Sequence, residues 1–373
     1  MKTFTIISNG CESLQFDGNK VAEEFHQRGI KAATNGDADI HVILGCTFTQ
    51  RQENGFRGLV EDAAGQSRDG QLVIVSGCFL KDESREGIIF TRKESVGDVL
   101  DKLLADERAD KVDTSPEAAA QTPFVAISEG CYGNCTFCSV RFVRGLHRSR
   151  PIHEVVSDVE RAAKRFGKAK LVGQEIVAYG KDIGTTLPEL IKKLFDLMPT
   201  LRMELGSLGT AWMKQFSDED LAVFADVRIE GNIHLPLQSA SNEVLRQMAR
   251  TYTFEQFSQL HAALKRFGVQ RFSTDLIAGF PGETESDHEK NLHFLKTNRF
   301  RFAQIFMYEP RPGTTAADME QIPRETRVRR TLELIGAYVA GYESFRTDES
   351  SNIDDILNTN IKIEEEEVIS FEG

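Results

Sequence analysis

The stretch that decides the fold is Phe124-Val125-Ala126-Ile127-Ser128-Glu129-Gly130-Cys131-Tyr132-Gly133-Asn134-Cys135-Thr136-Phe137-Cys138. Its first four residues are apolar and predict a short β-strand, which runs into Gly130 and three closely spaced cysteines. Three thiols within eight residues can wrap one face of a cubane iron–sulfur cluster, because such clusters are usually held by cysteines in short runs. Three ligands leave a fourth iron open, and an open position is what a reactant needs to bind a metal centre.

Zinc is a competing interpretation of the same cysteines. Either His147 or His153 could complete a tetrahedral site of three cysteines and one histidine, and such sites are usually structural. The spacing of four and then three residues favours iron–sulfur over zinc, and both interpretations stay open on spacing alone.

The other three cysteines, Cys11, Cys46 and Cys78, each follow a predicted strand within a few residues. Strands at 4–7, 40–44 and 72–75 alternate with helices at 21–28 and 50–64, a pattern typical of βαβ units and a parallel sheet. Ligands of open parallel sheets bind beyond the carboxyl ends of the strands. We therefore expect these thiols to converge, although three separate buried cysteines would be an ordinary alternative.

The rest of the chain predicts a second α/β unit. About six strand–helix repeats favour an open or partial (β/α)6 barrel over a closed eight-stranded one. The fold class is therefore α/β, with an N-terminal open parallel domain followed by the partial barrel. The expected divisions are residues 1–104 for the first domain, 105–122 for a linker, 123–346 for the barrel and 347–373 for an acidic tail. The predicted barrel strands are 124–127, 171–172, 202–205, 233–236, 271–276 and 303–307.

Composition narrows the class of protein. Six cysteines are too few for a disulfide scaffold in a chain of 373 residues, so metal binding or catalysis is favoured. The sequence shows neither a secretory signal nor an apolar run long enough for a membrane span, which predicts a cytoplasmic protein with no membrane partner.

The formal net charge of −12 repels phosphate backbones at long range.

The stretch GCYGNCTFCSVRFVRGLHRSRP, residues 130–151, resembles the radical S-adenosylmethionine (SAM) signature in its MiaB/RimO-type methylthiotransferase form. The resemblance covers roughly residues 1 to 345, and it includes the three N-terminal cysteines. Its further matches are Gly173-Gln174-Glu175, Tyr179-Gly180, 234–239, 250–253, 274–283 and 308–314.

The resemblance implies two [4Fe–4S] clusters. Cys131, Cys135 and Cys138 would hold the cluster whose open iron binds SAM, and reductive cleavage of SAM would yield a radical that abstracts hydrogen from an unactivated C–H. The other three cysteines would hold an auxiliary cluster that delivers sulfur. A second SAM would supply the methyl group, and the product would carry C–SCH3. An electron donor such as flavodoxin or ferredoxin is implied as a partner.

The resemblance also implies roles for several other side chains. Gln174 and Glu175 would accept from the SAM ammonium, Ser207 and Gln238 would meet its carboxylate or ribose, and Gly279 would begin a turn that lets the backbone approach the adenine. Arg144 and Arg311 would contact the acceptor as catalytic residues, although either could simply pair with a carboxylate.

The chain departs from the usual family pattern in three places. Family members usually have an asparagine shortly after the first cysteine, whereas here Cys11 is followed by Glu12-Ser13-Leu14. They also usually have an asparagine directly before the second cysteine, where this chain has Gly45. Family members usually add a TRAM domain, whereas only 26 residues follow Thr347, and nine of them are acidic. The acidic charge and short tail favour a protein or peptide acceptor over an adenosine of tRNA. Two further alternatives are a radical SAM enzyme whose auxiliary cluster only transfers electrons, and a zinc-stapled binding module.

Overall fold

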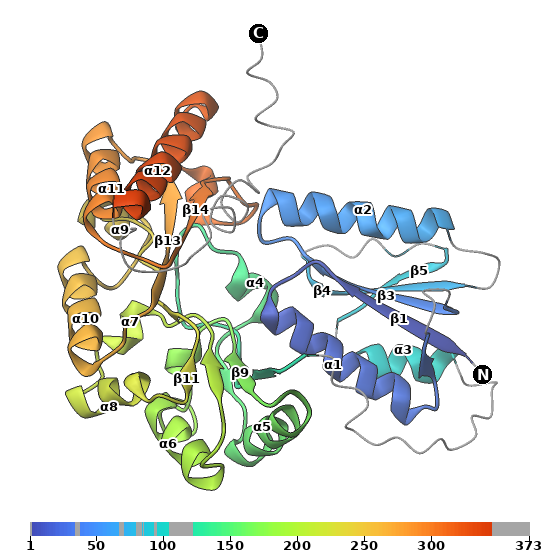
Figure 1. Cartoon of the computed structure of the whole chain (residues 1–373). Coiled ribbons are helices and arrows are strands. Elements are labelled where there is room, and N and C mark those ends of the chain that lie inside the picture. Colours follow the sequence, from blue (N-terminus) through green and yellow to red (C-terminus); the bar gives the residue numbers. More distant parts are fainter. Residues whose placement is uncertain are drawn as a thin grey trace.

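The computed structural model describes residues 2–33, 38–66, 71–79, 84, 86–92, 95–103 and 122–344. The predicted acidic tail lies outside these residues, as does the predicted linker except for Thr122. Figure 1 shows two α/β units side by side, one containing the N-terminus and the other wound by the remaining two thirds of the chain.

The N-terminal unit is built on a five-stranded parallel sheet with the strand order β2-β1-β3-β4-β5. This order reverses between β1 and β3, and such a switch point is where doubly wound sheets bind ligands beyond their carboxyl ends. Its elements are β1 (Thr3–Ser8), α1 (Glu12–Gln27), β2 (Lys31–Ala32), β3 (Ile40–Cys46), α2 (Gln50–Gln66), β4 (Leu72–Cys78), β5 (Ile88–Phe90) and α3 (Val96–Leu103).

Helices cover both faces of this sheet (Figure 1), because successive strand side chains point to opposite faces. Val42 and Leu44 of β3 pack in one core with α1 and α3, whereas Ile43 packs in another core with Phe56 and Val60 of α2. Burial on both faces explains the nearly continuous apolar runs of β3 and β4.

The second unit contains a four-stranded sheet in the order β11-β10-β9-β6 and a three-stranded sheet in the order β12-β13-β14, both parallel. A hydrogen bond from the Leu208 amide to the His234 carbonyl joins the two sheets into an open barrel. The strands are β6 (Phe124–Ala126), β9 (Ala169–Val172), β10 (Met203–Leu205), β11 (Ile229–Glu230), β12 (Ile233–His234), β13 (Phe272–Ala278) and β14 (Phe302–Met307).

Helices pack on the outside of the barrel strands (Figure 1). In α6 the buried side chains recur at helical spacing, at Leu187, Leu190, Ile191 and Leu194, so one stripe of the helix faces the core. The other helices of eight or more residues are α5 (Ile152–Phe166), α10 (Phe254–Phe267), α11 (Glu285–Thr297) and α12 (Arg324–Ser344). The shorter ones are α4 (Val140–Arg144), η3 (Ile176–Ala178), α7 (Thr210–Met213), α8 (Asp218–Ala222), η4 (Val223–Ala225), α9 (Asn242–Gln247) and η5 (Thr315–Asp318).

The predicted α/β class, the parallel N-terminal sheet and the predicted strands are confirmed, whereas α1 begins nine residues before its predicted start. The stretch Asp17-Gly18-Asn19 looks like a turn in the sequence. In the structure it is helical, because α1 packs so closely on β3 that a Cβ at Gly18 would lie 3.1 Å from Leu44.

The two units contact each other through α1, which packs against β6. Ion pairs between described residues cross the boundary. Among them, Arg144 pairs with Asp17 at 2.6 Å, Arg311 pairs with Glu53 at 2.6 Å, and Lys20 of α1 pairs with Asp158 of α5 at 3.6 Å. Within the described residues, no helix combines the length and apolar character that crossing a membrane requires.

Candidate functional site

The first cysteine triad lies on a loop that is closed at its neck by two short antiparallel strands, β7 (Ser128–Glu129) and β8 (Arg148–Ser149). Gly130 begins this loop with φ of +75°, and a Cβ there would lie 2.4 Å from the Leu146 carbonyl oxygen. Only glycine fits this position, so the sequence Gly130-Cys131 is a requirement of the loop neck.

The thiols of this loop turn around a second glycine. The Gly133 amide donates to Cys131 Sγ at 3.1 Å, and a Cβ on Gly133 would lie 3.1 Å from that sulfur and 3.7 Å from Cys135 Sγ. The loop is docked on the barrel by Thr136, whose hydroxyl donates to the Gln247 carbonyl at 2.9 Å. The glycine therefore leaves the space between two sulfurs free.

Two charged side chains from the barrel reach the same loop. Arg250 donates through Nη1 to Cys135 Sγ at 3.2 Å, and Glu175 interacts electrostatically with Cys131. Burial raises the pKa of Glu175 to about 7, against the opposing effect of Arg250. A Cβ on Gly209 would lie 2.0 Å from the Glu175 carboxylate, so this glycine makes room for it.

The second triad is assembled by the N-terminal sheet. Cys46 and Cys78 are register partners at the ends of β3 and β4, and Cys11 stands at the N-cap position of α1, just beyond β1. Each of the three follows a glycine, namely Gly10, Gly45 and Gly77. The sheet register therefore places Cys46 beside Cys78, and Cys11 interacts electrostatically with both of them.

Asn9 ties the end of β1 to the end of β3 and to the first turn of α2. Its side-chain oxygen accepts from the Cys46 amide at 3.0 Å, and its Nδ2 donates to the Gln52 carbonyl of α2 at 2.8 Å. At Gly45, where an asparagine is customary, a Cβ would lie 2.1 Å from the Phe56 ring. In this chain the Phe56 ring occupies the space that a side chain at position 45 would need.

Arg144 reaches the second triad from the barrel unit. Its Nε donates to Cys78 Sγ at 2.9 Å, its Nη1 donates to Glu129 at 3.1 Å, and its Nη2 pairs with Asp17. Burial alone would lower the pKa of Arg144, but Asp17 and Cys78 outweigh it and raise the pKa. The helix α4, which ends at Arg144, lies in Figure 1 between the barrel and the N-terminal unit.

Burial raises the thiol pKa values in both triads. It raises the pKa of Cys46 and Cys131 to about 11, and the pKa of Cys78 and Cys138 to about 12. A thiolate is the form that ligates metal, and a metal ion or a cationic neighbour is what draws the proton from such a thiol. Arg144 lowers the pKa of Cys78 and Arg250 lowers the pKa of Cys138, so each arginine opposes the effect of burial.

Two family models match the chain: the radical SAM superfamily over residues 125–295, and the uncharacterised protein family UPF0004 over residues 3–97. The threonylcarbamoyladenosine tRNA methylthiotransferase MtaB of Thermotoga maritima is 26% identical over 357 residues, covering 90% of this chain and 81% of that protein. The tRNA-2-methylthio-N(6)-dimethylallyladenosine synthase of Streptomyces griseus is 30% identical over 368 residues, covering 89% of this chain and 72% of that protein. The chain belongs to the radical SAM methylthiotransferase family.

The fold agrees with this family. The radical SAM methyltransferase TsrM from Kitasatospora setae superposes with a TM-score of 0.58 at 12% identity, over 85% of this chain and 75% of that one. The chain is therefore a radical SAM transferase, and its family implies [4Fe–4S] clusters and SAM as cofactors. Two sets of three thiols, one arranged around a glycine that leaves the space between its sulfurs free, fit such clusters.

Other residues predicted for SAM binding in this methylthiotransferase lie in three different environments. Gln174 uses its side-chain oxygen to accept from the Gly130 amide at 2.9 Å, so it supports the cysteine loop. Gln238 is buried with φ of +73°, and its Oε1 has no hydrogen-bond partner within the described part of the chain. Ser207 is half-buried beyond the end of β10.

Gly279 does not present its amide to an open space. Its N–H donates to the Glu283 carboxylate at 2.8 Å, and a Cβ on Gly279 would lie 2.5 Å from Arg327 of α12. The turn therefore packs against a helix in this structure, and its contact with adenine stays a prediction.

Both predicted catalytic arginines pair with carboxylates at the boundary between the units. Arg311 donates to Glu53 at 2.6 Å and to the Thr47 carbonyl at 2.5 Å, beside the second triad. Sequence reasoning missed Arg250, although the matching stretch 250–253 contained it. It also missed Asn9, because nothing in the local sequence marks either contact.

The histidines of the zinc interpretation are engaged or exposed elsewhere. His147 shares a hydrogen bond with Ser149 and stacks on Tyr132 with ring centroids 5.0 Å apart, and His153 is exposed on α5. In the described ranges, no group of three histidine, cysteine or acidic side chains is arranged to hold a single metal ion.

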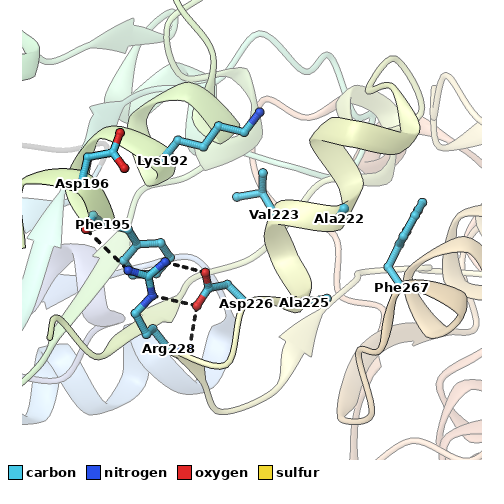
Figure 2. A pocket seen from close by; sticks show the side chains of 9 residues that line it. All are labelled: Lys192, Phe195, Asp196, Ala222, Val223, Ala225, Asp226, Arg228 and Phe267. Atoms are coloured by element: carbon cyan, nitrogen blue, oxygen red, sulfur yellow. Dashed lines mark hydrogen bonds and ion pairs between the residues drawn. The ribbon is translucent and has the colours of Figure 1, made fainter. Parts of the chain in front are cut away.

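Figure 2 shows a hollow of about 330 Å³ that is lined by side chains of α6 and η4, among others. Its Arg228 pairs with Asp226 at 2.6 Å, and both residues precede β11. The hollow is therefore at the amino ends of the barrel strands, opposite the end that carries Cys131. Its lining residues are Lys192, Phe195, Asp196, Ala222, Val223, Ala225, Asp226, Arg228 and Phe267.

Proposed function

We propose that this chain replaces an unactivated C–H of an adenosine in tRNA with C–SCH3. The observation that carries the proposal is the link between its two cysteine triads. Helix α4 begins two residues after Cys138 and ends at Arg144, whose Nε lies 2.9 Å from Cys78 Sγ. Five helical residues span about 7.5 Å. Hydrogen abstraction and sulfur insertion at one carbon need two centres near a single acceptor, and this short helix supports that arrangement.

The six cysteines divide between two cluster sites in this proposal. Cys131, Cys135 and Cys138 hold the cluster with an open iron for SAM, and the strand-end triad holds the auxiliary cluster. When bound, the clusters and SAM supply the radical, the sulfur and the methyl group. The residues of this chain hold those reactants in place and exclude water.

Two polar side chains of the barrel, Glu175 beside the first triad and the buried Gln238, support a SAM site. Glu175 interacts electrostatically with Cys131 and can accept from the SAM ammonium. Gln238 has a buried, unpaired Oε1 among the residues described, and a buried acceptor without a partner costs free energy until a donor arrives. We assign it a donor on SAM, either the ammonium or a ribose hydroxyl. Gln174 serves instead to hold the Gly130 amide.

The two relatives reported above favour a tRNA acceptor, since both are named for modified adenosines of tRNA. The formal net charge of −12 argues less strongly against tRNA binding than the number suggests. Residues 347–373 hold nine acidic side chains and one lysine, so they carry −8 of the formal −12 and leave −4 on the other 346 residues. The charge argument for a protein or peptide acceptor therefore rests mainly on the tail.

The test is a methylthiolation assay on defined acceptors. Anaerobically reconstituted protein, dithionite as electron source and methyl-labelled SAM are incubated with tRNA carrying threonylcarbamoyladenosine, tRNA carrying dimethylallyladenosine, or a mixed peptide digest. We expect label and one added sulfur in an adenosine of one tRNA. Label confined to peptides would overturn the tRNA acceptor, and a product without added sulfur would favour an auxiliary cluster that only transfers electrons.

Binding provides an independent check on the acceptor. A protein that contacts several phosphates binds tRNA less tightly as salt rises, because counterions are released on binding. We expect affinity for tRNA to fall between low and moderate salt, and the absence of any salt-dependent binding would count against the proposal.

A further inference from the structure

Arg144 occupies a position between the two units that a simple surface ion pair does not explain. Its side chain is only 6% exposed, and its three nitrogens contact three different elements. Nη2 meets Asp17 of α1, Nη1 meets Glu129 of β7, and Nε meets Cys78 at the end of β4. One guanidinium thus connects the loop of the first triad to a sulfur of the second.

The guanidinium has carboxylate partners besides the sulfur. Asp17 and Glu129 both pair with it. An arginine that served only to join the units could do so through these two ion pairs, which use Nη1 and Nη2. Here the Nε–H is instead directed at Cys78 Sγ at 2.9 Å.

Arg311 provides an internal contrast. It also runs from the barrel unit to the N-terminal unit, and it also lies beside the second triad, where its Nη2 donates to the Thr47 carbonyl and to Glu53. These two hydrogen bonds of Arg311 go to oxygen atoms, whereas Arg144 donates to a sulfur.

We propose that Arg144 is a positioning residue that sets the reduction potential of the second centre by donating its Nε–H to Cys78 Sγ. The inference rests on the proposed function, because it requires a cluster on Cys11, Cys46 and Cys78. A cluster that accepts one electron gains negative charge, and hydrogen bonds to its sulfurs and the local charge set how readily it does so. Loss of the donor therefore makes the centre harder to reduce.

The reduction potential of the second cluster is measured in protein that lacks the first cluster. In a background with Cys131, Cys135 and Cys138 changed to Ala, reconstituted protein is titrated with an external one-electron reductant and followed by electron paramagnetic resonance. At the potential that half-reduces the background cluster, we expect Arg144→Met to lower the ratio of reduced to oxidised cluster at least tenfold. For a one-electron couple this corresponds to 59 mV. Arg144→Lys keeps the charge without the planar fork, and its shift should be smaller.

Lys20→Met is the matched control, because Lys20 also crosses the boundary, to Asp158 at 3.6 Å, without touching a thiol. It should leave the potential unchanged. Full iron and an unchanged potential in Arg144→Met would overturn the proposal, as would an equal shift in the control.

A second variant decides the matter if Arg144→Met fails to hold iron. Glu129→Gln keeps the arginine and removes one negative charge beside it, and the Glu129 side chain is 25% exposed. The potential should then rise, and an unchanged or lower potential would overturn the proposal. Absence of iron in the background variant itself would refute the auxiliary cluster, and thus the proposed function, before any change at Arg144.

Discussion

The two cysteine triads of this protein are built by different means. The first lies within eight residues of one loop, and its geometry depends on glycines at its neck and between its thiols. The second is gathered from three strand ends that are 32 and 35 residues apart, and its geometry depends on the register of a parallel sheet. Local spacing therefore reveals the first triad, whereas only the topology of the sheet reveals the second.

Each triad also has its own arginine. Arg250 donates to Cys135 from within the same unit, and Arg144 donates to Cys78 from the neighbouring unit. The first centre is thus self-contained, while the second is complete only when the two units are in contact.

The largest effect is expected from changing Cys11, Cys46 and Cys78 together to Ala. The variant should still cleave SAM, because the loop triad does not depend on the N-terminal sheet for its ligands, but it should form no methylthiolated product. SAM cleavage and product are measured in one anaerobic reaction by mass spectrometry. Methylthiolated product at the parent level would contradict the division of labour between the triads.

Gly77→Ala should damage the second triad selectively. Gly77 has φ of +120°, and a Cβ there would lie 2.4 Å from the backbone oxygen of Gly45, its register partner. Strain at such a backbone position costs about 1–3 kcal/mol, and the clash moves the end of β4 with Cys78. We expect loss of the iron held by the second triad alone and a lower unfolding temperature.

Gly133→Ala is the counterpart in the first triad. Its Cβ would lie 3.1 Å from Cys131 Sγ, a tight contact with a side chain rather than with backbone. The variant should keep the iron of the second triad and lose SAM cleavage in part. If Gly133→Ala and Gly77→Ala reduced the same pool of iron, the triads would not be independent.

Glu175→Gln should weaken SAM binding by about ten- to a hundredfold, because a hydrogen bond to a charged group contributes about 1.5–3 kcal/mol. The dissociation constant is measured by equilibrium dialysis on the reconstituted protein. Glu189→Gln is the control, since this carboxylate caps α6 at the surface and should leave SAM affinity unchanged. Unaltered affinity in Glu175→Gln would remove this residue from the SAM site.

The smallest expected effect is on the pH dependence of folding stability, and it arises in the barrel rather than at either triad. Burial lowers the pKa of His261 to about 4, so the folded protein binds its proton less readily than the unfolded chain, whose ordinary value is 6.5. His261 thus contributes stability above pH 6.5 that is lost as the pH falls toward 4. His261→Phe should reduce the loss of unfolding free energy between pH 7.5 and pH 5 by about 2 kcal/mol, measured by urea unfolding. An unchanged pH dependence would contradict this.

The sequence predicts most of the fold and both cysteine triads, because these depend on short-range signals. Strands such as Ile40–Leu44 are apolar runs between turns, and Cys46 and Cys78 follow their strands directly. The gathering of the second triad follows from the rule that ligands bind beyond the carboxyl ends of parallel strands.

The partners of the sulfurs could not be predicted in the same way. Arg144 and Cys78 are 66 residues apart, and Arg250 and Cys135 are 115 apart. Which nitrogen reaches which sulfur depends on how the two units pack, and no local pattern encodes it. For the same reason the sequence does not reveal that Gln174 accepts from the Gly130 amide, and its contact with SAM stays a prediction.

Iron counting tests the central claim most directly. The parent protein and the two triple Ala variants, one for each triad, are reconstituted without oxygen, and iron and acid-labile sulfide are counted per chain. If both are four-iron clusters, the account predicts about eight irons in the parent and about four in each variant. Zinc in place of iron, or about four irons in the parent with none in the variant of Cys131, Cys135 and Cys138, would contradict two independent clusters.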